Sequence, residues 1–277
     1  MISKHRPSSR IIPGFNLTLG FSLTYLSLLI LVPLSMLILK TSSMSLSQIG
    51  SILTSPRVAA SFFLSFSLSA AAAFINIIFG ILTAWVLVRY EFRFKKVINA
   101  FIDLPFALPT AVAGISLTSL YSQNGWVGQY LDRLGIKASF TPLGIMIALI
   151  FIGLPFVVRS VEPILEDLDK EIEEAAFSLG ANRWQVFRKI IFPLIFPAAL
   201  AGAGMAFARA LGEYGSVVFI SGNMPFKTEV IPLLIMTKLE QYDYQGATVI
   251  ALATLLISFL LLFFINAWQC RLQRFLD

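Results

Sequence analysis

The sequence predicts an all-α, polytopic membrane protein with about six transmembrane helices. Its mean hydropathy is +0.82, hydrophobic residues make up 57% of the chain, and charged residues make up only 13%. Apolar runs long enough to cross a bilayer recur along the 277 residues, and polar or basic connections separate them. This composition excludes an ordinary water-soluble domain.

The apolar runs define the expected spans. We expect them at residues 15–39, 58–88, 98–121, 142–158, 198–220 and 246–268. The first run is longer than the apolar core of a signal peptide and ends at Lys40, which favours an uncleaved span. An apolar patch at 230–236 is expected at the membrane interface, and an alternative division of 198–236 gives a seventh span.

The third run contains two prolines, in the stretch DLPFALPTAVAG at 103–114. Pro105 and Pro109 are expected to kink the helix and to free backbone carbonyls. At membrane depth such carbonyls need protein or water nearby. This face of the helix therefore either lines a pathway or is filled by neighbouring helices.

Basic residues indicate which side of the membrane each connection faces. Six spans place both termini on one side, and the segments on that side hold fourteen basic residues: Lys4, Arg6, Arg10, Arg89, Arg93, Lys95, Lys96, Arg159, Lys170, Arg183, Arg188, Lys189, Arg271 and Arg274. The other side holds six: Lys40, Arg57, Arg133, Lys137, Lys227 and Lys238. Since lysine and arginine gather on the cytoplasmic side, we expect cytoplasmic termini. The same rule accounts for the net charge of +6 without a nucleic-acid partner.

The segment 162–197 differs from the rest of the chain. It holds seven acidic residues, whereas the other 241 residues hold eight. Its apolar residues recur at helical spacing: Ile164, Leu165, Leu168, Ile172, Ala176 and Leu179. The pattern predicts an amphipathic helix that begins near Pro163, ends at a left-handed Gly180 and is followed by a short helix capped by Asn182. Pro193 and Pro197 are expected to end that second helix.

An apolar stripe outside the bilayer needs a partner, and a soluble protein docking at the membrane face would supply one. The alternative is a solvated loop that joins two spans.

Two charged residues, Arg209 and Glu213, lie in the otherwise apolar fifth run. Each costs roughly 2.5–3.5 kcal/mol at the centre of a membrane helix. They are four residues apart, so they share a helix face and can pair. They form either an internal ion pair that ties spans together or a gate beside a pathway that meets an anion.

Several kinds of chemistry are excluded. No P-loop motif is present, so the chain is not expected to hydrolyse ATP. Cys270 is the single cysteine and His5 the single histidine, which excludes an internal disulfide and a Cys/His metal site. No nucleophile and base converge to suggest a membrane enzyme.

A spaced motif lies in the acidic segment. Glu174-Ala175-Ala176 is followed after three residues by Gly180, after nine more by Ile190, and after one more by Phe192-Pro193. This spacing resembles the EAA loop of ABC-importer permeases, with Phe192 where leucine is usual. The resemblance implies a coupling segment that docks on an ATP-hydrolysing subunit through Glu174, Ala175, Ala176 and Gly180. It also implies that Ile190 and Pro193 take part in the coupling.

Further stretches of sequence point to one family among these permeases. RALGEYGSVVFISGN at 209–223, FKTEV at 226–230 and the proline-containing stretch of the third run resemble the sulfate/thiosulfate (CysT-type) permease family. The resemblance implies a type I importer transmembrane domain over residues 58–268, with 162–197 as its coupling segment. Residues 1–57 would supply an N-terminal cytoplasmic segment, the first helix and a connection, and 269–277 a cytoplasmic tail.

The resemblance also implies partners. These are a second, related permease, two copies of an ATP-binding subunit and an extracytoplasmic sulfate-binding protein, in a bacterial inner membrane or a plastid envelope membrane. No cofactor is expected on this chain, because a partner would hydrolyse the ATP. Two alternatives stay open: the same machine for molybdate or tungstate, and an ion-coupled secondary transporter, for which the sequence offers no inverted repeat.

Overall fold

The computed structural model describes residues 15–273, and every regular element in that part of the chain is a helix, as predicted. In chain order the elements are α1 (Phe15–Leu26), a π-helical turn (Ser27–Leu31), α2 (Val32–Ser42), α3 (Leu46–Leu53), α4 (Pro56–Arg89), α5 (Lys95–Ala107), α6 (Thr110–Tyr121), α7 (Gly128–Arg133), α8 (Pro142–Glu166), α9 (Lys170–Ser178), α10 (Arg183–Val186), a second π-helical turn (Phe187–Ile191), α11 (Phe192–Leu211), α12 (Val217–Ser221), α13 (Ile231–Glu240) and α14 (Tyr244–Gln273). The predicted cytoplasmic residues Lys4, Arg6, Arg10 and Arg274 lie outside the described residues.

The span count agrees with the prediction of about six. Five stretches within the described residues are long and apolar enough to cross a membrane: Phe15–Ser42, Pro56–Arg89, Pro142–Glu166, Arg183–Leu211 and Tyr244–Ile265. The bent pair α5 and α6 gives a sixth if it is counted as one span. A seventh span has no support in this part of the chain, because the ten residues of α13 reach only about 15 Å. The predicted interfacial patch at 230–236 forms the start of this short helix.

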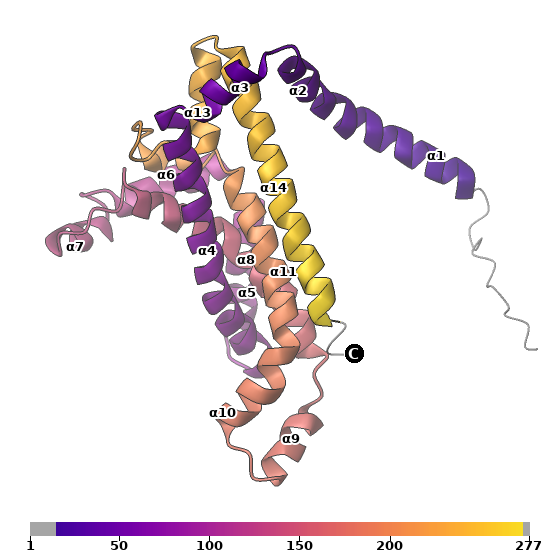
Figure 1. The fold of residues 1–277 in the computed structure, drawn as a ribbon. Helices are drawn as coiled ribbons and strands as arrows, with labels where there is room; N and C mark the ends of the chain where they lie inside the picture. The colour runs from indigo at the N-terminus through magenta and orange to yellow at the C-terminus, as the bar shows by residue number, and fades with distance from the viewer. Residues whose placement is uncertain (1–14, 274–277) are drawn as a thin grey trace, which may run out of the picture.

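The centre of the bundle consists of α4, α8 and α11, which pack side by side (Figure 1). Two glycines bring these helices unusually close. A Cβ atom on Gly80 would lie 2.7 Å from Cβ of Val157, and a Cβ atom on Gly202 would lie 2.7 Å from Cα of Val157. Any larger residue at either position would push α4 or α11 away from α8.

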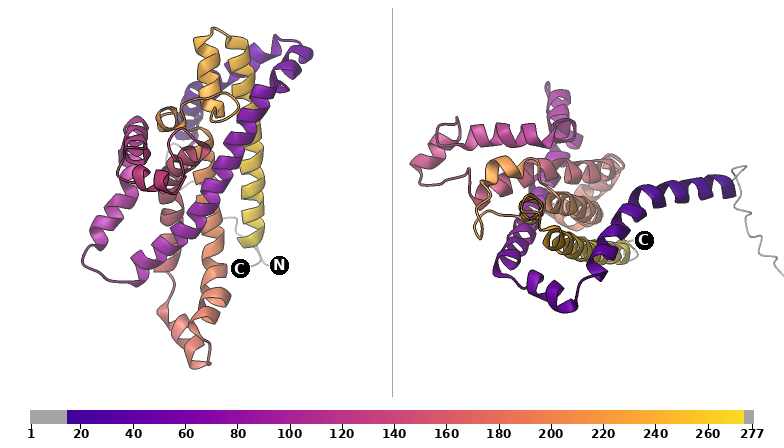
Figure 2. Two further views of the ribbon diagram at one scale, coloured as in Figure 1. Left: turned by 90° about the vertical axis from the view of Figure 1, so that its left-hand side faces the viewer. Right: turned by 90° about the horizontal axis from the view of Figure 1, so that it is seen from above.

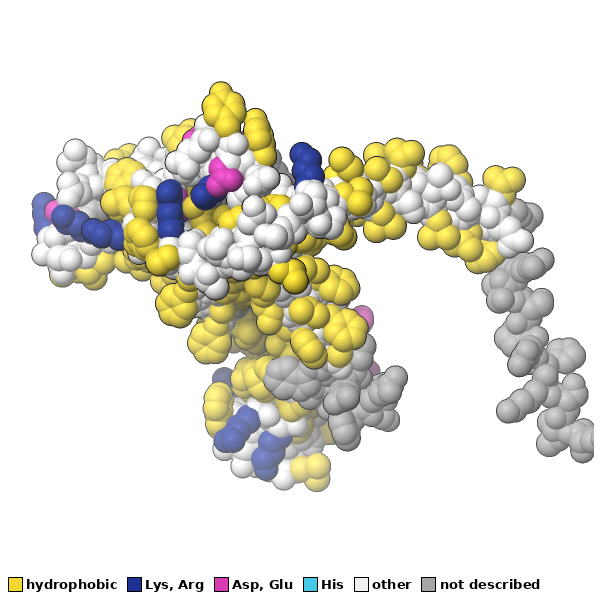
Figure 3. Space-filling model, turned by 45° about the horizontal axis from the view of Figure 1, so that its top comes forward, with side chains coloured by type: hydrophobic (Ala, Val, Ile, Leu, Met, Phe, Trp, Pro, Cys, Tyr) yellow, Lys and Arg dark blue, Asp and Glu magenta, His cyan; other side chains and the backbone are white. Residues whose placement is uncertain are grey.

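The first helix lies apart from this bundle. The stretch Phe15–Ser42 extends sideways as an arm, and no residue in its most apolar part is buried (Figure 2). Hydrophobic side chains cover the arm and the flanks of the bundle (Figure 3). The exposed apolar surface is what a helix surrounded by lipid requires.

The predicted third span differs from the expectation of one kinked helix. The chain bends by 114° between α5 and α6, at Leu108 and Pro109. Pro105 lies inside α5 and does not end it. The helix breaks instead just before Pro109, because the residue before a proline is driven out of the helical region. That residue is Leu108, which takes φ −80° and ψ 135°. Pro109 is the N-cap of α6, which begins at Thr110.

The predicted amphipathic helix from Pro163 to Leu179 is wrong as one element. The fourth span continues through Pro163 to Glu166 as part of α8, and a separate helix, α9, begins at Lys170. The break contains Asp167 and Asp169, which have low helix propensity. The turn between the helices lets Leu165 and Ala176 pack in one buried cluster.

The expected break at Pro193 and Pro197 is also wrong. The helix that starts at Arg183 continues to Leu211, so the fifth span begins and ends earlier than the predicted 198–220. A π-helical turn at Phe187–Ile191 precedes Pro193, and Phe192 donates its N–H to the Phe187 carbonyl. This wider turn accommodates the proline ring without ending the helix. The same arrangement precedes Pro33 in the first helix.

An acidic cap fixes the start of α14. Oδ1 of Asp243 accepts the backbone N–H of Gly246 at 2.9 Å, and Nζ of Lys238 lies 2.8 Å from Oδ2. The hydrogen bond from Lys238, followed by the one from Gly246, lowers the pKa of Asp243 below its ordinary value. The carboxylate therefore stabilises the fold above pH 4 or so, and this contribution is lost as the pH falls through the lowered pKa.

Asp243→Ala is therefore expected to lower the stability of the purified protein by about 1 kcal/mol at pH 7, the usual cost of losing a helix cap. The difference from wild type should shrink as the pH is lowered toward 3. Thermal unfolding in detergent, measured across this pH range, checks both statements. Equal melting temperatures at pH 7 would show that the cap contributes nothing.

Candidate coupling segment and gate

The candidate coupling segment consists of α9, α10 and the turn between them. It projects from the end of the bundle where α4 ends and α5 begins, whereas α3 and α13 lie at the opposite end (Figures 1 and 2). The last turns of α14 lie at the same end as the coupling segment (Figure 1). The distribution of basic residues predicts that this end is the cytoplasmic one.

Local sequence explains the shape of the turn. Gly180 has φ +84°, the left-handed conformation that glycine adopts without strain. Its N–H reaches the Phe177 carbonyl at 2.9 Å, and the N–H of Ala181 reaches the Ala176 carbonyl at 3.0 Å. These two bonds are the Schellman pattern that ends a helix. The left-handed Gly180 predicted from the sequence is confirmed.

A capping box begins the next helix, as the sequence predicted for Asn182. The Asn182 side chain accepts the N–H of Gln185 at 2.8 Å, and the Gln185 side chain accepts the N–H of Asn182 at 2.9 Å. The two reciprocal bonds satisfy donors at the start of α10 that would otherwise lack partners. The direction in which the chain re-enters the bundle is thereby fixed.

The six predicted coupling residues fall into two groups. Glu174, Ala175 and Gly180 are exposed, whereas Ala176 is buried against the bundle. Ile190 and Pro193 are half-buried on the helix that leads into α11. Three of the six thus face outward, and the other three pack against their own chain.

One side of the coupling segment packs on the spans and the other is open. Ala176 and Val186 belong to the buried cluster that also contains Leu165 of α8 and Ile195 of α11. On the outer side, Leu179 is 89% exposed and Trp184 is 65% exposed. Ile172 and Phe177 are also exposed. A large exposed apolar surface of this kind is typical of a site where another protein binds.

The charged residues of the fifth span form an ion pair at the opposite end of α11. Nη1 of Arg209 lies 2.6 Å from Oε2 of Glu213, and their side chains are 38% and 1% exposed. Glu213 lies in the loop just beyond the end of α11, and its Oε1 accepts the N–H and the Oγ–H of Ser216 at 2.9 and 3.0 Å. The buried carboxylate fixes the loop 212–216 and partly neutralises an accessible guanidinium.

The structure brings the two candidate gate elements together. A Cβ atom on Gly215 would lie 2.0 Å from Oγ1 of Thr110, the first residue of α6. A Cβ atom on Gly114 would lie 2.6 Å from Cα of Ser216. The loop that holds Glu213 therefore touches α6, whose N-cap is Pro109, whereas Pro105 lies four residues earlier, inside α5.

Sequence reasoning missed two buried polar contacts. Arg57 pairs with Glu229 through Nε and Nη2, at 2.7 and 2.6 Å, and the Glu229 side chain is fully buried. The pair ties the start of α4 to the chain before α13. The available signals were one acidic residue in FKTEV and one basic residue at the start of an apolar run, and these two residues are 172 positions apart.

The second missed contact is Asn76, fully buried in the middle of α4. With its amide nitrogen toward the Ile150 carbonyl (3.2 Å) and its oxygen toward the Leu154 N–H (3.3 Å), it bonds to the backbone of α8 just before Pro155. The carbonyl that Pro155 leaves without an N–H partner is that of Phe151, so these bonds tie α4 to α8 and do not serve the proline itself. A single asparagine in the second apolar run was the available signal.

Comparison with known proteins places the chain in a family. Residues 76–277 match the family described as "Binding-protein-dependent transport system inner membrane component". The chain is 48% identical over 267 residues to "Sulfate transport system permease protein CysT" of Salmonella typhimurium, covering 96% of each chain. It is 51% identical over 249 residues to the protein of that name from Synechococcus elongatus, covering 90% of each. A "Probable sulfate transport system permease protein cysT" of Nephroselmis olivacea is 47% identical over 257 residues, covering 93% of this chain and 90% of the relative.

Solved structures share the fold. A chain of a bacterial alginate ABC transporter, in complex with its oligosaccharide-bound periplasmic protein, superposes with a TM-score of 0.77 at 16% identity. This match covers 93% of our chain and 94% of that one. A chain of the MetNI methionine ABC transporter superposes with a TM-score of 0.56 over 84% of our chain and all of that one, also at 16% identity. The chain therefore belongs to the family of binding-protein-dependent transport system inner membrane components, the multi-pass permease subunits of ABC importers.

Proposed function

We propose that this chain forms half of the membrane pathway of an ATP-driven importer of sulfate and thiosulfate. Near-50% identity to sulfate permeases over nine-tenths of the chain supports the substrate. The observation that carries the mechanism is the coupling segment, which is anchored on one face and open on the other. The partners are two copies of an ATP-binding subunit, a second related permease and an extracytoplasmic sulfate-binding protein.

The coupling residues act by docking. Glu174, Ala175 and Gly180, together with the exposed Leu179 and Trp184, meet the ATP-binding subunit. Ala176, Ile190 and Pro193 hold this surface on the spans. ATP is bound and hydrolysed by the partner, and this chain holds no cofactor. When the ATP-binding subunits close, the segment moves with them and shifts α8 and α11 between inward-open and outward-open states. The partner must bind the two states with different free energies, because otherwise no work is transmitted.

The gate lies at the other end of α11. We assign it to the loop 212–216, with Glu213 paired to Arg209, and to the start of α6 at Pro109. Arg209 is exposed enough to meet a passing anion, and Glu213 prevents the guanidinium from holding that anion tightly. Pro105 contributes by setting the direction of the last turn of α5, which leads into the break at Leu108. The close contact between Gly215 and Thr110 means that neither element can move alone.

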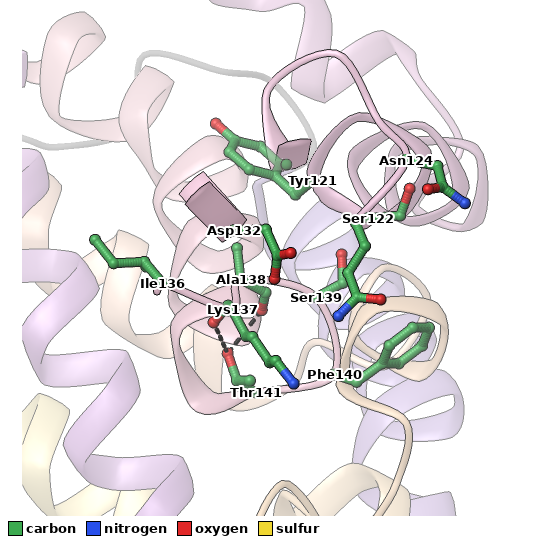
Figure 4. Close-up of a pocket in the computed structure, with 12 residues that line it drawn as sticks. Tyr121, Ser122, Asn124, Asp132, Ile136, Lys137, Ala138, Ser139, Phe140 and Thr141 are labelled. Carbon is green, nitrogen blue, oxygen red and sulfur yellow. Dashed lines mark hydrogen bonds between the residues drawn. The ribbon is translucent and has the colours of Figure 1, made fainter. Parts of the chain in front are cut away.

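The extracytoplasmic binding protein has a candidate surface beside α7. Between Pro142 and Arg159, α8 rises about 26 Å, close to the thickness of the hydrocarbon core of a bilayer. This length would place residues 121–141 at the outer membrane surface, where they form a pocket of about 440 Å³ lined by both polar and apolar side chains (Figure 4). Asp132 and Lys137 line it, and neither forms an ion pair within the described residues. The pocket suits a charged loop of a soluble partner.

The test is uptake of radiolabelled sulfate by cells that lack their own permease and express this chain with its partner subunits. We expect ATP-dependent uptake that persists when ion gradients are collapsed and that unlabelled sulfate and thiosulfate inhibit. Stronger inhibition by molybdate than by sulfate would assign the machine to another oxyanion. Uptake that needs no ATP-binding subunit would instead identify an ion-coupled transporter.

A further inference from the structure

An ion pair connects the first central span to the coupling segment. Nη2 of Arg89, the last residue of α4, lies 2.5 Å from Oε1 of Glu173 in α9. The two residues are 84 positions apart, and their side chains are only 11% and 19% exposed. A pair this well shielded from water interacts more strongly than one on the open surface.

Arg89 also contacts the other half of the coupling segment through aromatic rings. Its guanidinium lies over the ring of Trp85, 5.8 Å from the centroid. Trp85 meets Phe187 edge-on at 5.8 Å, and Phe187 stacks with Trp184 at 5.8 Å. Arg89 therefore contacts α9 through an ion pair, and it is linked to Trp184 of α10 through the rings of Trp85 and Phe187.

Few other contacts hold α9 to the spans. Ala176 is the one residue buried in that helix among those whose side chains are described, and Glu171, Ile172, Glu174, Ala175, Phe177 and Ser178 are exposed. Without the ion pair, α9 would be held by a single small side chain and by the turns at its ends. The contact with Arg89 therefore carries much of the lateral connection between α9 and α4.

The coupling segment is covalently connected to α8 and α11 but not to α4. The chain runs from α8 into α9 and from α10 into α11, so force on the segment passes directly to these two spans. Helix α4 has no such connection, although it packs against both. We propose that Arg89 is a positioning residue that latches α9 to α4 through Glu173, so that movement of a docked ATP-binding subunit displaces α4, α8 and α11 together. This inference rests on the proposed function.

The test uses charge reversal. Arg89→Glu and Glu173→Arg each place like charges in contact, and the double variant restores an opposite pair. Reversal of Glu91 and Lys95, another ion pair near the same membrane face, is the matched control, since the Glu91 side chain is 88% exposed. In proteoliposomes with the partner subunits, each single variant should transport at least about fivefold less sulfate per ATP hydrolysed, a typical size for coupling between sites. The double variant should regain most of the sulfate transport per ATP that the single variants lose, and the control should match wild type.

A second readout does not depend on transport. Trypsin cleavage at the exposed Arg183, from the cytoplasmic side of membrane vesicles, should be faster in the single variants and return toward wild type in the double variant. Failure of the wild type to transport sulfate would overturn the proposed substrate, while the cleavage rates would still report the latch. Wild-type coupling and wild-type cleavage in Arg89→Glu would overturn the latch, as would a double variant that recovers neither.

Discussion

Gly180→Val is expected to lower sulfate uptake by at least about tenfold while leaving the protein inserted in the membrane. Gly180 has φ +84°, and a β-branched residue is strained in the left-handed region. Space is not the cause, because a Cβ atom at this position would meet no atom within 4 Å. To relieve the strain, the turn must give up its two hydrogen bonds, which displaces Leu179 and Trp184 from the docking surface. A loss worth about 1.4 kcal/mol of docking energy is enough for a tenfold effect.

Two controls accompany this variant. Asparagine tolerates the left-handed conformation, so Gly180→Asn should retain most of the uptake. Gly50, in α3, also has open space around its missing Cβ but no positive φ, so Gly50→Ala should behave as wild type. Uptake and the amount of protein in the membrane are measured together. Normal uptake by Gly180→Val at a normal membrane level would show that the left-handed turn is dispensable.

Glu213→Gln is expected to lower both the maximal rate of uptake and the KM for sulfate. Glutamine can still accept the bonds from Ser216, so the loop 212–216 stays in place. The change removes the charge that neutralises Arg209, whose side chain is 38% exposed. An unpaired guanidinium would then hold a passing oxyanion through a charged hydrogen bond worth about 1.5 kcal/mol, which corresponds to roughly tenfold in affinity. Tighter holding lowers KM and slows release, a pattern that loss of folding would not produce.

The matched control is the double variant Arg209→Gln with Glu213→Gln, which has no charge at the gate. Its KM should return to or exceed the wild-type value, since the residue that holds the anion is gone. Initial rates of uptake at a series of sulfate concentrations measure both constants. An unchanged KM in Glu213→Gln would place the pair away from the path of the anion and leave it as a structural tie.

Local sequence patterns predicted the parts of the site that depend on single residues. Gly180 takes the left-handed turn and Asn182 caps α10, because each is settled by the conformational preference of one side chain. The second, fourth and sixth spans follow from apolar runs whose length matches a bilayer. These features need no knowledge of what lies nearby in space.

Prolines were the main source of error, because their effect depends on the turn around them. Pro193 stands after a π-helical turn that accommodates it, so the helix continues. Pro109 follows a residue that is forced to be extended, so the helix breaks completely where a kink was expected. The sequence pattern predicted that Pro163 begins a helix, whereas it lies inside α8. The sequence pattern alone does not distinguish these cases.

The long-range polar contacts could not be predicted at all. Arg89 with Glu173, Arg57 with Glu229 and Asn76 with the backbone of α8 each join segments that are far apart in the chain. A charge in a sequence shows that a partner is needed, but the packing of α4 against α8 and α11 decides which partner it finds. The contact of Arg89 with Glu173, and the contact of the loop 212–216 with α6, therefore emerged only from the three-dimensional arrangement.

The central claim is that an ATP-hydrolysing partner drives sulfate through this chain by docking on the coupling segment. The most direct measurement is radiolabelled sulfate uptake in cells that lack their own permease and carry the partner subunits, with wild type, Glu174→Arg and Glu171→Arg compared side by side. Both acids are exposed on α9, but only Glu174 belongs to the EAA motif. We predict that wild type and Glu171→Arg restore uptake and that Glu174→Arg does not, at equal membrane levels of all three. Equal uptake by wild type and Glu174→Arg would contradict the coupling role of this segment.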